Sequence, residues 1–183
     1  MQFTPYIEVD DPVGGTLVRL QSDHIQGGSE WGVRAEYVTR KGKQAYESLG
    51  WMNGEEMHVI VPHGMKMGQL KYRESGYDGL AEGSFHCDDD YFNRFWEKGL
   101  RTLYVNMRDT YFDCPDRERA QWWGDVTVLM GECFYTYSTR VHNLMRKGIL
   151  ELCAFQNDAG IIHSPIPGNY DAELPAQMLA SIG

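Results

Sequence analysis

Residues 87–109 read CDDDYFNRFWEKGLRTLYVNMRD, and they mark the point at which the chain changes from strand-like to helix-like sequence. Aspartates that can cap a helix come first, and apolar side chains then recur at steps of three and four residues. These side chains are Tyr91, Phe92, Phe95, Trp96, Leu100, Leu103, Tyr104 and Met107. The spacing predicts an amphipathic helix with one apolar face.

Short runs rich in β-branched residues precede this helix, and glycine-rich or Asn-Gly breaks separate them. The runs cover residues 16–20, 33–39, 57–62 and 69–75. Such spacing is typical of an antiparallel β-sandwich. Helical periodicity returns over about residues 122–137 and 139–156. The sequence therefore predicts an α+β fold, with a β-sandwich domain over residues 1–85 and a helical domain over residues 86–183.

The last segment, AELPAQMLASIG (172–183), begins another amphipathic helix after a loop rich in proline and glycine. Leu174, Met178, Leu179 and Ile182 would form its apolar side. We expect these side chains to need a partner surface that the remaining sequence does not supply. The chain is therefore expected to be an internal piece of a longer protein.

Composition excludes several classes of function. The chain has 183 residues, 17 basic against 26 acidic, and a net charge of −9, whereas nucleic-acid binding depends on clustered Lys and Arg. No apolar run approaches the roughly 20 residues of a membrane-spanning helix. The N-terminal residues lack the features of a signal peptide, but residues upstream of Met1 could supply one. The compartment of the longer protein, periplasmic, secreted or cytoplasmic, therefore stays open.

The potential metal ligands show no recognisable spacing. Cys87, Cys114, Cys133 and Cys153 form no CxxC or CxxH pair, and the six histidines show no HExxH or clustered arrangement. We expect the cysteines to be buried free thiols. No metal and no cofactor is predicted.

The stretch DCPDRERAQWWGD (113–125) sets charged residues against two adjacent tryptophans. If a helix begins near residue 120, Glu118, Trp122 and Asp125 share one side of it. Two carboxylates make a poor core surface, because buried like charges repel each other. Such a side could bind a sugar, since an aromatic ring stacks on the sugar ring and carboxylates accept hydrogen bonds from hydroxyls.

A purely structural interpretation of the same stretch stays open. Asp113 would then cap a helix, while Arg117 and Arg119 would pair with Asp116 and Glu118. The tryptophans would fill the core. The pattern alone does not choose between this interpretation and sugar binding.

The stretch resembles the signature of the bacterial α-L-rhamnosidases of glycoside hydrolase family 78, approximately Asp-Cys-Pro-x-Arg-Glu and, a few residues later, Trp-x-Gly-Asp. Residues 83–115 and AELPAQMLASIG resemble helices of that family's catalytic barrel, and YRESGYD (72–78) resembles the end of the preceding sandwich domain. The segment AQWW stands where many members have a Gly-Trp-Thr type sequence. The resemblance implies that residues 86–183 are the first helices of a truncated (α/α)6 barrel.

The resemblance also implies a role for each residue. Glu118 matches the general acid of an inverting hydrolase, Asp113 and Asp125 match carboxylates that hold the rhamnose hydroxyls, Arg117 matches the arginine that lines the pocket, and Trp122 matches its aromatic wall. Burial beside tryptophan and other carboxylates is expected to raise the pKa of Glu118 toward that of a proton donor. The implied partners are a rhamnose-containing glycoside or polysaccharide and the remainder of the longer chain.

The general base is the missing part of this site. The resemblance places it far downstream, in the second half of a twelve-helix barrel, and only 98 residues follow residue 85. Glu173 and Asp171 are the late acids that could replace it, but DAELPAQ is more typical of a capped helix start. We expect the chain to carry the acid and sugar-binding carboxylates but not the base, and to be inactive alone.

Two functions of other classes stay open. The sandwich could be a carbohydrate-binding module that binds sugar through Trp31, Trp51 or Tyr46, although such side chains are more often part of a core. The exposed helix surfaces could instead serve a structural role by driving association.

Overall fold

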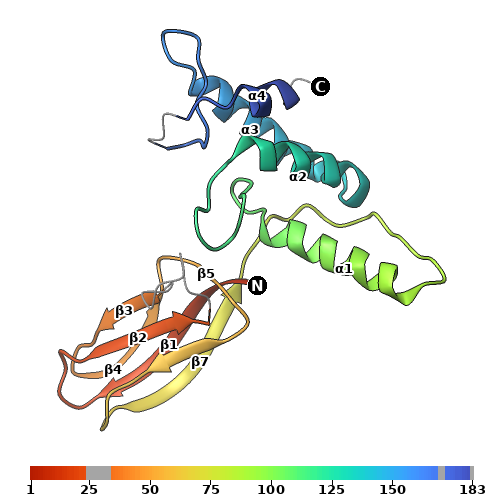
Figure 1. Cartoon of the computed structure of the whole chain (residues 1–183). Coiled ribbons are helices and arrows are strands. Elements are labelled where there is room, and N and C mark those ends of the chain that lie inside the picture. The colour runs from red at the N-terminus through yellow and green to blue at the C-terminus, as the bar shows by residue number, and fades with distance from the viewer. Residues whose placement is uncertain (24–33, 169–171, 182–183) are drawn as a thin grey trace. The chain divides into compact units, whose positions relative to one another are not determined.

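The computed structural model describes residues 1–23, 34–168 and 172–181 (Figure 1). Trp31, Asp171 and Ile182 lie outside the described residues. The chain divides into two compact units, Met1–Ser75 and Gly76–Gly183. The domain boundary that the sequence predicts, between residues 85 and 86, stays a prediction.

The first unit contains two antiparallel sheets. In one, β1 (Gln2–Asp11) pairs with β4 (Gly42–Glu47), β5 (Met52–Asn53) and β7 (Lys66–Glu74). The other has the order β3 (Arg34–Val38), β2 (Leu17–Ser22), β6 (Met57–Ile60). Alternate side chains of β1 and β2 meet in one buried cluster, which contains Phe3, Ile7, Val9, Val18, Leu20 and Met52. The predicted antiparallel β-sandwich is confirmed.

The sequence prediction missed β1, the strand on which three others pair. Pro5 lies within it and is usually read as evidence against a central strand. Its carbonyl nevertheless accepts a hydrogen bond from the Ser48 N–H at 3.0 Å. Ile7 and Val9 alternate with acidic residues, so the period-two pattern is present but short.

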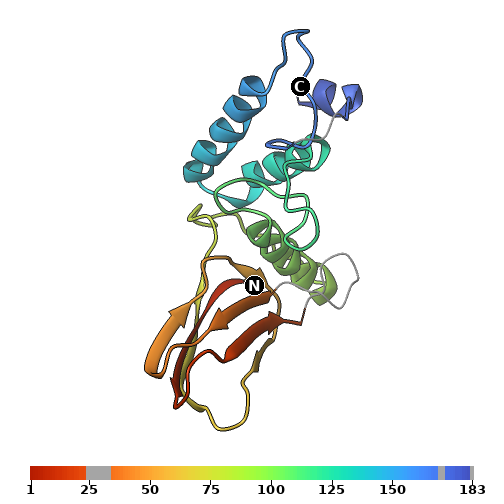
Figure 2. The ribbon, with the colours of Figure 1, turned by 90° about the vertical axis from the view of Figure 1, so that its left-hand side faces the viewer.

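The second unit is helical. It contains α1 (Asp90–Val105), α2 (Trp123–Thr136), the 3-10 turn η2 (Thr139–Val141), α3 (His142–Ala154) and α4 (Pro175–Ala180). The three predicted long helices are confirmed. Both views show the segment between α1 and α2, drawn in green, as an irregular loop (Figures 1 and 2). No helix in the described part of the chain is both long and apolar enough to cross a membrane.

The start of α1 follows the capping rule. The Asp89 carboxylate accepts a hydrogen bond from the Tyr91 N–H at 2.8 Å and caps the helix. The apolar face is less buried than predicted, because Phe92 and Phe95 are 51% and 64% exposed while Leu103 is buried. Only the C-terminal end of the face therefore contributes to the core.

The core of the second unit joins α1, α2 and α3. Side chains three or four residues apart on α2 lie at its centre, as an amphipathic helix requires. The buried cluster contains Leu103, Met107, Tyr111, Trp123, Val126, Leu129, Cys133, Val141, Leu144, Met145, Leu152 and Ile166. All four cysteines are free thiols, as predicted, but Cys133 alone among them is buried and Cys153 is exposed.

The helix near the C-terminus has a partner surface, contrary to the sequence prediction. Met178 of α4 packs against the core cluster of this unit. The Gly124 N–H donates to Gln177 Oε1 at 3.1 Å, which ties α4 to the start of α2. Leu179 is 69% exposed, so the apolar side is covered in part.

Candidate functional site

The stretch 113–125 is a loop that leads into a helix, and α2 begins at Trp123. Residues 115–118 form a turn, and Arg119 has a φ of 52°, in the left-handed region. Glu118 and Trp122 therefore do not lie on one helical face, and the spacing argument from the sequence is wrong on this point. The loop before α2, not a shared helical face, brings the side chains of this site together.

Asp113 and Ala120 close this loop. The Asp113 N–H donates to the Ala120 carbonyl at 2.9 Å, and the Ala120 N–H donates to Asp113 Oδ1 at 3.0 Å. The same Ala120 carbonyl accepts a hydrogen bond from the Trp122 N–H at 3.1 Å. We call residues 113–120 the closed loop. Its two ends are held together by backbone and side-chain bonds.

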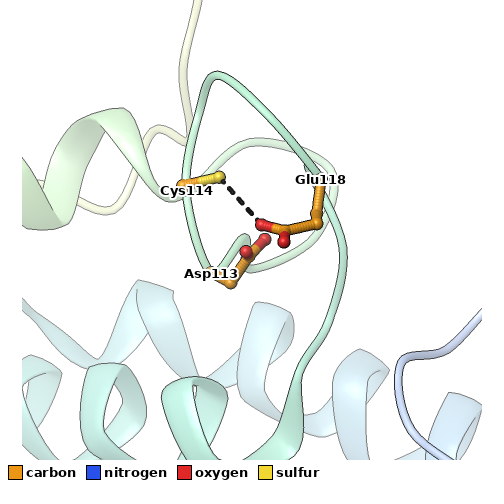
Figure 3. Close-up of side chains that lie close together, drawn as sticks. All are labelled: Asp113, Cys114 and Glu118. Atoms are coloured by element: carbon orange, nitrogen blue, oxygen red, sulfur yellow. Dashed lines mark hydrogen bonds between the residues drawn. The ribbon is translucent and has the colours of Figure 1, made fainter. Parts of the chain in front are cut away.

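Glu118 points back across the closed loop toward Asp113 and Cys114 (Figure 3). The Cys114 thiol donates to Glu118 Oε2 at 3.5 Å, and the Arg117 guanidinium forms an ion pair with Glu118 Oε1. The Glu118 side chain is 25% exposed and that of Arg117 is 69% exposed. The carboxylate is therefore partly sheltered, and its cationic partner is the more exposed of the two.

The pKa values of the two carboxyl groups move in opposite directions. The pKa of Glu118 is lowered to about 2, first by a hydrogen bond with Asp113 and then by one with Arg117. The pKa of Asp113 is raised, first by partial burial and then by the hydrogen bond with Glu118. The prediction that the pKa of Glu118 is raised is therefore wrong for this chain; it is the pKa of Asp113 that is raised.

The other predicted site residues lie around the start of α2. Trp122 is the residue before the helix and is half-buried, and Asp125 is exposed in the first helical turn. A negative charge is favourable at that position because it faces the positive end of the helix dipole. Within the described ranges, no hydrogen bond or ion pair is found that joins Asp125 to Asp113 or Glu118. The structure thus brings together Asp113, Arg117 and Glu118.

Gln121 is a buried residue that the sequence analysis passed over. It is 0% exposed, and its side-chain Nε2 donates to Glu151 Oε2 of α3 at 2.9 Å and to the Ile166 carbonyl at 3.3 Å. The Ile166 N–H in turn donates to the Gln121 carbonyl at 3.3 Å. Its place in AQWW, where the sequence departs from the family pattern, was the only signal that pointed to it.

Asp113, Cys114 and Glu118 also bring three possible metal-ligand atoms within 4.8 Å of one another. Two of these side chains already bind the Ala120 N–H and the Arg117 guanidinium. The third, a thiol, is a ligand that calcium and magnesium do not favour. We treat the cluster as a hydrogen-bonded group and assign no metal to it.

Of the sandwich side chains named as a possible sugar platform, Trp51 is half-buried and Tyr46 packs against a neighbouring ring. The Tyr46 ring stacks on Tyr37 at a centroid distance of 4.4 Å, and both rings pack against the sandwich core. One face of Tyr46 is therefore covered. Glu173, the late acid named as a substitute base, is exposed just before α4.

The comparisons with known proteins point to the same family as the sequence motif does. The sequence model of the bacterial alpha-L-rhamnosidase 6 hairpin glycosidase domain matches residues 81–177. An alpha-L-rhamnosidase of Formosa agariphila is 36% identical over 55 residues, which are 30% of this chain and 6% of that protein.

Two solved structures share the fold over 99% of this chain. One is a rhamnosidase of glycoside hydrolase family 78 from Bacillus sp. GL1, with a TM-score of 0.81 and 20% identity. The other is an alpha-L-rhamnosidase from Dictyoglomus thermophilum, with a TM-score of 0.73 and 18% identity. The chain covers 20% and 22% of their lengths, so it spans about a fifth of the solved structures it matches.

Proposed function

Since this chain belongs to the family of bacterial alpha-L-rhamnosidase six-hairpin glycosidase domains, a family of glycoside hydrolases, we propose that it forms part of an enzyme that releases L-rhamnose from terminal α-L-rhamnosides with inversion. The close approach of the Asp113 and Glu118 carboxyl groups, which have oxygen atoms within 4.8 Å of each other, carries this proposal (Figure 3). Glycosidic bond cleavage needs a carboxyl group that gives a proton to the departing oxygen. Two carboxyl groups held this close do not readily ionise together, so one of them can keep the proton that this step needs.

The pair forms only the acid half of the site. In an inverting hydrolase the acid and base lie about 6.5–9.5 Å apart, so that a water molecule and the sugar fit between them. The ligand atoms of Asp113 and Glu118 lie within 4.8 Å and the two groups bind each other, which leaves no room for a sugar. Asp113 is therefore not the base, and we propose that the base lies in the part of the longer protein that this chain does not span.

We assign the remaining roles as the family resemblance implies. Glu118 gives the proton, Asp113 and Asp125 bind rhamnose hydroxyls, and Trp122 forms an aromatic wall. Arg117 lines the pocket, and its side chain, paired with Glu118, is 69% exposed. Its movement onto the sugar would remove the cation that lowers the pKa of Glu118. Substrate binding would thus raise the proton affinity of the pair.

The product stereochemistry tests the proposed reaction. An aryl α-L-rhamnoside is hydrolysed by the longer protein inside an NMR tube, and the first anomer of rhamnose is recorded before mutarotation. We expect the β-anomer from the longer protein and negligible turnover by the 183-residue chain alone. Initial release of the α-anomer would contradict inversion, and appreciable turnover by the chain alone would contradict the missing base.

A further inference from the structure

Gln121 immediately follows the closed loop, whose last residue, Ala120, binds both the backbone and the side chain of Asp113. The position of residue 121 therefore decides where Ala120 lies, and with it the Asp113 carboxyl group. A buried amide is costly unless its groups are hydrogen-bonded. An apolar side chain of similar size would fill the same space, so the amide calls for a reason other than packing.

The amide of Gln121 is held in one orientation. Its Nε2 group has two N–H donors, and these meet Glu151 Oε2 and the Ile166 carbonyl. The reversed amide would place Oε1 against the Glu151 carboxylate, which is repulsive. In the observed orientation Oε1 faces Gly148, where an added Cβ would lie 3.4 Å away. Within the described residues Oε1 has no hydrogen-bond partner, so the two bonds of Nε2 alone fix the amide.

Glu151 provides a fixed point on α3. Its other carboxylate oxygen, Oε1, binds Lys147 Nζ at 2.6 Å, one helical turn earlier. The carboxylate is thereby held between a lysine on its own helix and the amide of Gln121. A chain of contacts runs from the middle of α3 through Gln121 to the end of the closed loop.

We propose that Gln121 is a positioning residue, which fixes the end of the closed loop to α3 through Glu151 and so keeps Asp113 against Glu118. The residue does not touch the substrate in this proposal. Gln121 acts through Ala120. Its effect on catalysis rests on the proposed function of Asp113 and Glu118. Its structural effect on the pair does not depend on that function.

The test compares variants of the 183-residue chain by NMR titration of the Asp113 side-chain carbon. Gln121→Leu and Glu151→Leu remove the bond, while Glu151→Gln keeps an oxygen that can accept it. Burial and the contact with Glu118 raise the pKa of Asp113, and we expect this pKa to fall toward its ordinary value in the two leucine variants, because the loop end shifts and the pair separates. Glu151→Gln should titrate like the parent chain, and Arg117 and Cys114, which also contact Glu118, are unchanged in every variant.

A control separates positioning from general loss of stability. Ser138→Ala removes a buried 2.8 Å bond from the Ser138 hydroxyl to the Gly79 carbonyl, after the far end of α2. It should lower the unfolding midpoint without changing the pKa of Asp113. An unchanged pKa of Asp113 in Gln121→Leu would overturn the proposal. If Gln121→Leu does not fold, the pKa of Asp113 in Glu151→Leu tests the proposal instead. This variant is the milder one because the Glu151 side chain is partly exposed.

Activity provides a second, separate readout. In the longer protein, Gln121→Leu should lower kcat by about 10- to 100-fold with a smaller effect on KM, since misplacement of a reacting group has costs of this size. Glu151→Gln should restore kcat to near the parent value. A changed titration with no hydrolase activity in the unmodified protein would support the positioning role and reject the proposed function. An unchanged titration of Asp113 in an active enzyme would reject the positioning role and support the proposed function.

Discussion

The Asp113 carboxylate and the Ala120 N–H are joined at 3.0 Å, and the Asp113 N–H and the Ala120 carbonyl are joined at 2.9 Å. One aspartate thus closes the loop with its backbone and its side chain together. Its carboxyl group also meets Glu118 across the closed loop. The same residue therefore has a structural and a chemical role, and substitutions can separate them.

Substitutions at Asp113 should distinguish the two roles. Asp113→Ala removes the acceptor of the Ala120 N–H and should lower the free energy of unfolding by about 1–3 kcal/mol. Asp113→Asn keeps an oxygen at that position and should lose much less stability, although it removes the titratable carboxyl group. Urea denaturation of the three chains measures the difference. Equal losses in both variants would show that the Ala120 bond does not close the loop.

Arg117→Gln should make stability less dependent on acid pH. The folded pKa of Glu118 is about 2 and the unfolded value is about 4.3, so the stability gained from this shift is present above about pH 4.3 and is lost as the pH falls through about 2. The variant should be roughly 0.5–1 kcal/mol less stable near about pH 7, because the pair is exposed on the arginine side. The difference should vanish toward pH 2.

Urea denaturation across this pH range measures the effect of Arg117. Arg146→Gln, which removes an exposed cation from α3, is the matched control and should show no such convergence. A constant difference between parent and Arg117→Gln from neutral to acid pH would argue against the ion pair as the cause.

Trp123 should be among the most sensitive positions in the helical unit. It is 1% exposed at the centre of the core cluster, so Trp123→Ala should cost about 3–5 kcal/mol. Val128, on the same helix and 60% exposed, is the control, and Val128→Ala should change stability by less than about 0.5 kcal/mol. Thermal unfolding followed by circular dichroism gives both values. Similar losses at the two positions would contradict the assigned face of α2.

The pH profiles of the longer protein should report the movement of Arg117. The basic limb of kcat/KM gives the pKa of the acid pair in the free enzyme, and that of kcat gives it in the substrate complex. We expect the basic limb of the kcat profile to lie at higher pH than that of the kcat/KM profile, because the bound sugar would draw Arg117 away from Glu118. Arg117→Ala should raise the limb of kcat/KM toward that of kcat. Identical limbs in the unmodified enzyme would refute this movement.

Much of the helical unit could be predicted from the sequence. Asp89 and the apolar steps of α1 predicted a capped helix, and both are present. The exposure of Phe92 and Phe95 could not be predicted, because periodicity identifies an apolar face but not what covers it. The strand β1 was missed because Pro5 and the acidic residues weaken its pattern.

The sequence named the three residues that meet in the closed loop, but not their electrostatics, and the roles of all five site residues stay predictions. The motif named Asp113, Arg117 and Glu118, and the structure brings them together. The pKa of Glu118 was predicted in the wrong direction because a turn, not a helix, places first Asp113 and then Arg117 against its carboxylate. Gln121 escaped notice because nothing in a sequence shows that one polar residue beside two tryptophans is fully buried.

The leaving-group dependence of Glu118→Gln in the longer protein tests the central claim, that the Asp113 and Glu118 pair supplies the proton. For α-L-rhamnosides of weakly acidic phenols, kcat/KM should fall by about 100- to 10,000-fold. For a dinitrophenyl rhamnoside, whose leaving group needs little protonation, the loss should be far smaller. Glu132→Gln, at an exposed position of α2, should leave both rates unchanged. An equal loss on both substrates, or no loss on either, would contradict the account.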